Sequence, residues 1–118
     1  MKHSSHTELP PVLAQHLPII QALCRKHQVK QLWAFGSVLR GDLGEHSDID
    51  LLYVMDRESI PAETFLANFY AFYDGLKATF QREVDLINYQ ALNNPYFLEE
   101  LDQDKVLLYD YTGEKISI

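Results

Sequence analysis

The chain has 118 residues, 47% of them hydrophobic, and a formal net charge of −7 from 17 acidic and 10 basic residues. This charge balance argues against direct nucleic-acid binding, which needs a basic surface. The single cysteine excludes an internal disulfide, and no apolar run reaches the length of a membrane span. We therefore expect one soluble, cytoplasmic domain over residues 1–118, with a polar, frayed segment at residues 1–8.

Two stretches of the chain show the apolar periodicity of helices. From Val12 onward the spacing is helical, but Pro18 either kinks this helix or opens a second one. Residues 61–80 predict a longer helix with one apolar stripe, which is the side expected to face the core. The stripe consists of Phe65, Phe69, Phe72, Leu76 and Phe80. Cys24 is interpreted as a small core residue of the first helical stretch.

Four short apolar runs predict strands, the last of them at a sheet edge. They cover residues 31–35, 48–55, 84–87 and 105–109. Between them we expect a helical turn, a polar loop and a short helix that begins at Asn94-Pro95, at residues 37–40, 41–47 and 96–101. Helices that interleave with strands in this way are typical of an α/β or α+β domain, with a small mixed sheet flanked by helices.

Three aspartates are the candidate catalytic residues. Asp48 and Asp50 open the second strand, so both carboxylates project from one face while Ile49 points into the core. Carboxylates this close repel each other unless a cation lies between them, and Mg²⁺ prefers oxygen ligands. Asp85 lies among apolar residues of the third strand, where an acid is costly without a partner. We expect Asp85 to join the metal site or act as a base; the alternative is that it merely starts its strand at the solvent end.

A Gly-Ser turn precedes the aspartates and is the candidate phosphate-binding element. Gly36 allows the backbone to approach a phosphate closely. Ser37 opens a helical turn whose free N–H groups and hydroxyl can bind an anion, and Arg40 could neutralise phosphate charge. His46, in the loop before the aspartates, could contact phosphate or metal, although a loop histidine is usually only solvated.

The spacing of these elements is similar to the signature of polymerase-beta-like nucleotidyltransferases. In that signature a Gly-Ser pair is followed, after ten residues, by Asp-x-Asp, here Asp48-Ile49-Asp50. The text around both halves, with the later Val84–Ile87 and Asn94–Phe97 segments, resembles the minimal nucleotidyltransferase (MNT) branch. The resemblance covers residues 18–109 and implies a polymerase-beta-like nucleotidyltransferase fold.

The resemblance also implies roles for individual residues. Gly36 and Ser37 would hold the triphosphate of ATP, and Asp85 would complete the metal site and help to deprotonate the attacking hydroxyl. The three aspartates together would bind two Mg²⁺ ions. Many relatives have a basic residue directly after the serine, where this chain has Val38. Arg40 is then the cation that the motif itself supplies.

The family reaction is in-line attack of an acceptor hydroxyl on the α-phosphorus of a nucleoside triphosphate, with pyrophosphate leaving. MNT proteins of this size resemble the MntA-type antitoxin of HEPN/MNT toxin–antitoxin pairs, which transfers AMP onto a tyrosine of its HEPN ribonuclease partner. The resemblance therefore implies a protein adenylyltransferase with a HEPN toxin as acceptor. Two alternatives stay open: a non-catalytic module that neutralises its partner by occlusion, and a small-molecule nucleotidyltransferase of the aminoglycoside type.

Several residues outside the motif allow more than one interpretation. Tyr96 and Phe97 either pack the short helix onto the sheet or, together with Tyr109 and Tyr111, form a surface for a partner. Arg82 and Glu83, just before the third strand, are interpreted as a surface ion pair that contributes little to stability.

Overall fold

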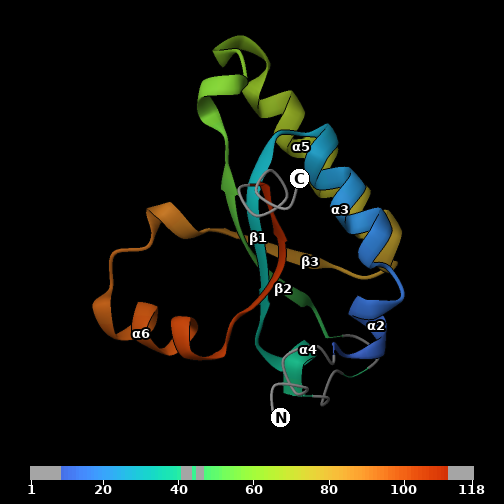
Figure 1. Cartoon of the computed structure of the whole chain (residues 1–118), viewed down its shortest axis with the longest axis vertical. Coiled ribbons are helices and arrows are strands. Elements are labelled where there is room, and N and C mark those ends of the chain that lie inside the picture. The colour runs from blue at the N-terminus through green and yellow to red at the C-terminus, as the bar shows by residue number, and fades with distance from the viewer. Residues whose placement is uncertain (1–8, 41–43, 45–46, 112–118) are drawn as a thin grey trace.

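A four-stranded mixed sheet is the frame of the protein (Figure 1). The structure, a computed structural model, describes residues 9–40, 44 and 47–111. The strands lie in the order β3-β2-β1-β4, with β1 antiparallel to β2 and β4, and β2 parallel to β3. Their bounds are β1 Val29–Phe35, β2 Ile49–Met55, β3 Val84–Asn88 and β4 Val106–Asp110. All four predicted strands are confirmed, with ends shifted by one or two residues, and β4 lies at an edge as predicted.

Helices cover the two faces of this sheet unequally (Figure 1). The long helices α3 and α5 lie against one face, and α6 lies on the opposite side. The helices are α2 Pro11–Ala14, α3 Leu17–Lys26, α4 Ser37–Arg40, α5 Phe65–Phe80 and α6 Pro95–Asp104. Short 3₁₀ turns occur at η1 Arg57–Ser59, η2 Ala62–Thr64 and η3 Tyr89–Ala91. The predicted fold class, a small mixed sheet flanked by helices, is confirmed.

The helix boundaries decide one open alternative and correct two expectations. Pro18 lies in the first turn of α3, so the second of its two interpretations is right. The helix expected over residues 61–80 begins at Phe65, because Pro61 has an extended backbone (ψ 141°) and is followed by the η2 turn. The short helix expected over 96–101 runs on to Asp104. Its start is as predicted, since the Asn94 side chain accepts hydrogen bonds from two N–H groups of the first turn.

The main core lies between the sheet and helices α3 and α5. Phe72, Leu76 and Phe80 of the predicted stripe are buried, and Phe65 and Phe69 are partly buried against the same cluster. Cys24 is fully buried in this core, as predicted. The α5 stripe thus fixes the helix on the sheet face that does not carry the candidate catalytic side chains.

Gly75 allows the two long helices to approach each other closely. A Cβ atom at this position would lie 2.9 Å from Cδ2 of Leu23 in α3, which is closer than side-chain atoms normally pack. The glycine weakens α5 by about 1 kcal/mol relative to alanine. The close contact between α3 and α5 thus depends on a residue that lowers the stability of α5.

A smaller cluster lies on the other face of the sheet and supports α6. It contains Trp33, Leu52, Val54 and Leu101. Tyr96 does not join it: 80% of this side chain is exposed, so the interpretation that it packs against the sheet is wrong. Tyr109 is buried in the main core, so the interpretation that it forms part of a partner surface is wrong, whereas Phe97 and Tyr111 are exposed.

Two expectations fall on residues that the structure does not describe. These are the frayed segment at residues 1–8 and most of the polar loop at 41–47, including His46. In residues 9–40, 44 and 47–111, each helix is too short or too polar to span a lipid bilayer.

Candidate active site

The two aspartates of the Asp-x-Asp motif lie at the beginning of β2. Asp50 is the second residue of the strand, and Asp48 immediately precedes it. Ile49 is fully buried in the main core, as predicted. Because side chains alternate along a strand, Asp50 shares its sheet face with Leu52 and the smaller cluster. The motif therefore presents its carboxylates on the face opposite α3 and α5.

The third aspartate lies beside the second. Asp85 of β3 is the register partner of Asp50 in the parallel pair of strands, so the sequence prediction that the two strands bring these acids together is confirmed. The reason given for it is wrong, however, because Asp85 is exposed and pays no burial cost. Since β3 is an edge strand, its apolar neighbours in the sequence do not enclose the carboxylate.

The fold disfavours the ionised form of Asp50. Burial raises the pKa of its carboxyl above the ordinary value of 3.8, and the negative charges of Asp85 and Asp48 raise the pKa further. The Arg40 guanidinium lowers it. All three aspartates therefore interact electrostatically at one place, and a cation there would relieve their mutual repulsion.

The Gly-Ser turn lies against the same carboxylate. Phe35, the last residue of β1, is the register partner of Asp50, and Gly36 follows with a left-handed φ of +83°. A Cβ atom at Gly36 would lie 2.7 Å from Oδ2 of Asp50. Glycine is needed here both for its backbone conformation and because the Asp50 side chain occupies the space that any other side chain would need.

The residues after the glycine form the short helix α4. Ser37 is its first residue and Arg40 its last. Val38 is buried in the main core, so the position that is basic in many relatives points away from the carboxylates in this chain. Arg40 supplies positive charge near Asp50 instead, as its effect on the Asp50 pKa shows.

Sequence reasoning missed the role of Arg82. Its Nη1 atom donates hydrogen bonds to the carbonyl oxygens of Gly44, at 2.6 Å, and Ser47, at 3.0 Å. Glu83, its expected ion-pair partner, lies 3.5 Å from Lys77 instead. Arg82 thus ties the beginning of β3 to the chain just before Asp48. No sequence signal marks such a bond, because every residue carries a carbonyl group.

Whether the site suits a divalent metal can be judged from its donor atoms. The three aspartates offer only carboxylate oxygens, the ligands that Mg²⁺ prefers. In the described part of the chain, no three His, Cys, Asp or Glu side chains converge closely enough to hold an ion as they stand. Asp48 and Asp85 are exposed, so rotation of their side chains meets little obstruction. The donor chemistry and the placement on adjacent strands therefore fit Mg²⁺.

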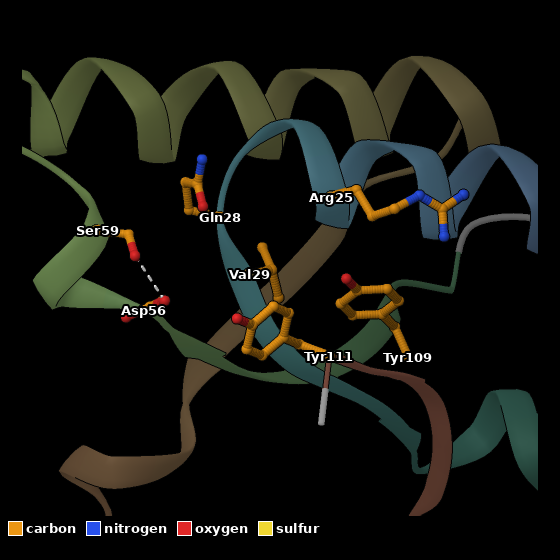
Figure 2. Close-up of a pocket in the computed structure, with 7 residues that line it drawn as sticks. All are labelled: Arg25, Gln28, Val29, Asp56, Ser59, Tyr109 and Tyr111. Atoms are coloured by element: carbon orange, nitrogen blue, oxygen red, sulfur yellow. Dashed lines mark hydrogen bonds between the residues drawn. The ribbon is translucent and has the colours of Figure 1, made fainter. Parts of the chain in front are cut away.

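A separate cavity of about 220 Å³ lies at the other end of the sheet (Figure 2). It is lined by Arg25, Gln28, Val29, Asp56, Ser59, Tyr109 and Tyr111, and Ser59 donates a hydrogen bond to Asp56 there. A strand rises about 3.3 Å per residue, so the six residues from Asp50 to Asp56 separate this cavity from the aspartates by roughly 20 Å. It adds no residue to the candidate active site.

Comparisons with known proteins agree on one class of protein. The sequence profile of the family described as "Polymerase beta, Nucleotidyltransferase" matches residues 18–114. A proposed protein adenylyltransferase of Methanocaldococcus jannaschii is 28% identical over 100 residues, covering 85% of this chain and 94% of that protein. Another from the same organism is 30% identical, with the same coverage of both chains.

Solved structures share the fold. A proposed minimal nucleotidyltransferase has a TM-score of 0.67 at 24% identity, covering 85% of this chain and 96% of its own. One chain of a toxin–antitoxin complex with AMP-PNP has a TM-score of 0.60 at 16% identity, covering 83% and 76%. One chain of a complex between tri-AMPylated Shewanella oneidensis HEPN toxin and MNT antitoxin has a TM-score of 0.55 at 14% identity, covering 86% and 76%.

The family match and the fold define an enzyme of the nucleotidyltransferase class. More particularly, the chain belongs to the polymerase beta nucleotidyltransferase family, and it resembles the minimal members of that family. The predicted polymerase-beta-like fold is thereby confirmed.

Arg82→Ala is expected to lower nucleotidyl transfer by roughly tenfold to a hundredfold, because small displacements of catalytic groups cost that much. We expect a lower kcat and a higher Mg²⁺ concentration for half-maximal rate, because the loosened segment carries Asp48. Arg82→Lys keeps a cationic donor and should restore part of the rate. Arg57→Ala, beyond the other end of β2, controls for lost positive charge. Unchanged kinetics in Arg82→Ala would exclude the positioning role.

Proposed function

We propose that this chain transfers AMP from ATP to a tyrosine hydroxyl of a HEPN ribonuclease toxin and so acts as its antitoxin. The observation that carries the proposal is the pairing of Asp50 with Asp85 on adjacent strands, beside the Gly36 turn. The relatives named as protein adenylyltransferases support the reaction. The fold shared with chains of HEPN/MNT complexes supports the partner.

The chemistry requires one bond to form and one to break. The tyrosine oxygen attacks the α-phosphorus of ATP, and the bond from that phosphorus to the oxygen bridging to the β-phosphate breaks. The products are a tyrosyl-AMP ester and pyrophosphate. Asp85, which is exposed at the sheet edge, would accept the proton that the hydroxyl loses.

Positioning and neutralisation of charge are the remaining tasks of the site. Asp48, Asp50 and Asp85 would hold two Mg²⁺ ions, which when bound neutralise charge on the triphosphate. Gly36 and Ser37 would bind phosphate oxygens at the end of β1. The Arg40 guanidinium, which already acts on Asp50, would add positive charge at the same place.

The direct test incubates the protein with ATP labelled at the α-phosphate, Mg²⁺ and the product of the adjoining gene, which the proposal expects to be a HEPN toxin. Label should pass to a toxin tyrosine and ribonuclease activity should fall. Asp48→Ala/Asp50→Ala should transfer no label. Equal behaviour of the wild type and this double variant in the transfer assay would refute the proposal.

Neutralisation of the ribonuclease by the double variant, without transfer, would identify occlusion as the mechanism instead. Label transfer to an aminoglycoside, with none to the toxin, would identify a small-molecule enzyme. With an aminoglycoside offered as a second acceptor, each alternative thus gives a distinct result.

A further inference from the structure

In the described part of the chain, the contacts that hold helix α6 on the sheet come from one side of the helix. Leu101 is its buried residue and packs with Trp33. Asp102 accepts hydrogen bonds from the Tyr89 hydroxyl, at 2.7 Å, and from the Lys105 ammonium, at 3.0 Å. The same ammonium lies 5.4 Å from the centroid of the Trp33 ring. These contacts anchor the C-terminal half of α6.

Among the residues that the structure describes, the outer side of α6 is an exposed surface that is both aromatic and acidic. Tyr96, Glu99, Glu100 and Gln103 are spaced i, i+3, i+4 and i+7, so they form one stripe along the helix. All four are exposed, and Tyr96 is 80% exposed. The helix sequence PYFLEELDQD contains four acids and no basic residue. We name this stripe the α6 outer surface.

This surface lies on the side of the sheet where the candidate catalytic carboxylates project. Trp33 and Leu52 are register partners in β1 and β2, and both belong to the cluster that supports α6. Asp50 lies two residues before Leu52, so it has the same orientation. Figure 1 shows α3 and α5 on the opposite side. A protein that docked on α6 would therefore also face the aspartates.

We propose that the α6 outer surface docks on the RNA-binding surface of the acceptor ribonuclease. This inference rests on the proposed function for the identity of the acceptor. A ribonuclease must present cations to RNA phosphates and flat side chains to unstacked bases. The carboxylates of Glu99 and Glu100 offer negative charge, as RNA phosphates do. The exposed Tyr96 ring offers an aromatic face, as an unstacked base does. Charge complementarity therefore selects this occupant for the surface.

Docking of this kind links two outcomes that sequence reasoning kept apart. The contact itself would exclude RNA from the toxin, and it would also bring a toxin hydroxyl to the side of the sheet that carries Asp50 and Asp85. Transfer of AMP would then make a reversible block permanent.

The test measures binding separately from catalysis. Asp48→Ala/Asp50→Ala serves as the parent, and its affinity for the HEPN toxin is measured by calorimetry at near-physiological salt. Adding Glu99→Lys/Glu100→Lys to the parent should raise the Kd for the toxin at least tenfold, and adding Tyr96→Ala should raise it about fivefold. An uncleavable RNA oligonucleotide should compete with the parent for the toxin.

A matched control separates the α6 outer surface from net charge. Glu58→Lys/Glu63→Lys makes the same change in net charge at two exposed acids beyond the other end of β2. Its Kd should stay within about twofold of the parent. Equal weakening by the two charge reversals, or a ternary complex with RNA, would overturn the inference. Absence of any toxin binding by the parent would overturn it as well.

The same variants distinguish this inference from the proposed function. If the catalytically intact chain with Glu99→Lys/Glu100→Lys modifies the toxin with unchanged KM, the docking inference fails and the proposed function stands. If the parent binds through α6 but the wild type transfers no AMP, docking stands and the proposed function fails.

Discussion

Asp50→Asn is expected to abolish AMP transfer, by at least about a thousandfold, while making the metal-free protein slightly more stable at neutral pH. The two effects have one cause. Burial and the charges of Asp85 and Asp48 raise the pKa of Asp50 in the folded protein. In the proposed function this ionised carboxylate holds the metal, although the fold disfavours its charge, and asparagine keeps its shape without its charge.

The direction of the stability change follows from proton linkage. The pKa of Asp50 is higher in the folded than in the unfolded chain. Between pH 3.8 and the raised pKa, the folded state therefore holds more of this proton than the unfolded state does. This group's contribution to the free energy of unfolding therefore falls over that interval and stays low at neutral pH. Asparagine removes this loss of stability. The free energy of unfolding should rise by about 1 kcal/mol or less, because water screens the charges of the partly exposed cluster.

Thermal unfolding with EDTA and with Mg²⁺ checks both effects. In EDTA at neutral pH, Asp50→Asn should melt above the wild type, whereas Asp74→Asn, an exposed acid on α5, should not. Mg²⁺ should raise the Tm of the wild type by mass action and leave Asp50→Asn unchanged. A variant that melts below the wild type in EDTA, or that retains a tenth of the transfer rate, contradicts this account.

Gly36→Ala is expected to lower transfer at least about a hundredfold, although alanine adds only a methyl group. The methyl carbon would lie 2.7 Å from Oδ2 of Asp50, so that carboxylate must move. The positive φ of Gly36 adds roughly 1–2 kcal/mol of backbone strain for any other residue. The loss of activity should exceed the loss of stability, because displacement of Asp50 affects transfer directly.

Transfer rates at low and saturating ATP, measured beside the Tm, test this expectation. Gly75→Ala is the matched control, since its methyl group meets Leu23 far from the aspartates. It should alter stability and leave transfer per folded molecule unchanged. If Gly36→Ala loses stability and activity in the same proportion as Gly75→Ala, the contact with Asp50 has no special role.

Local patterns predicted most of the fold. The α5 stripe and the alternation around Ile49 are set by helical and strand geometry, so sequence spacing was sufficient for both. The adjacency of Asp50 and Asp85 was expected because a metal site needs a third acid, but it depends on β2 and β3 being parallel neighbours, which the sequence does not show. That Asp50 is partly buried and Asp85 exposed could not be predicted, since it depends on β3 lying at an edge and β2 in the interior.

Contacts between distant segments account for what sequence reasoning missed. The packing of Gly36 against Asp50 depends on the antiparallel register of β1 and β2. The bonds from Arg82 to the carbonyls of Gly44 and Ser47 span more than thirty residues. Tyr96 was compatible with packing or exposure, because the sequence of α6 does not show how far the helix extends from the sheet.

The edge position of β3 has a consequence for the dynamics of the sheet. In the described sheet β3 is hydrogen-bonded to β2 alone, so its opening should need less free energy than that of the inner strands. A ligand that bridges Asp50 and Asp85 would join this outer strand to the interior one. Amide hydrogen exchange in β3 would then slow when the site is filled and quicken when product leaves, so the mobility of one sheet edge would report the occupancy of the site.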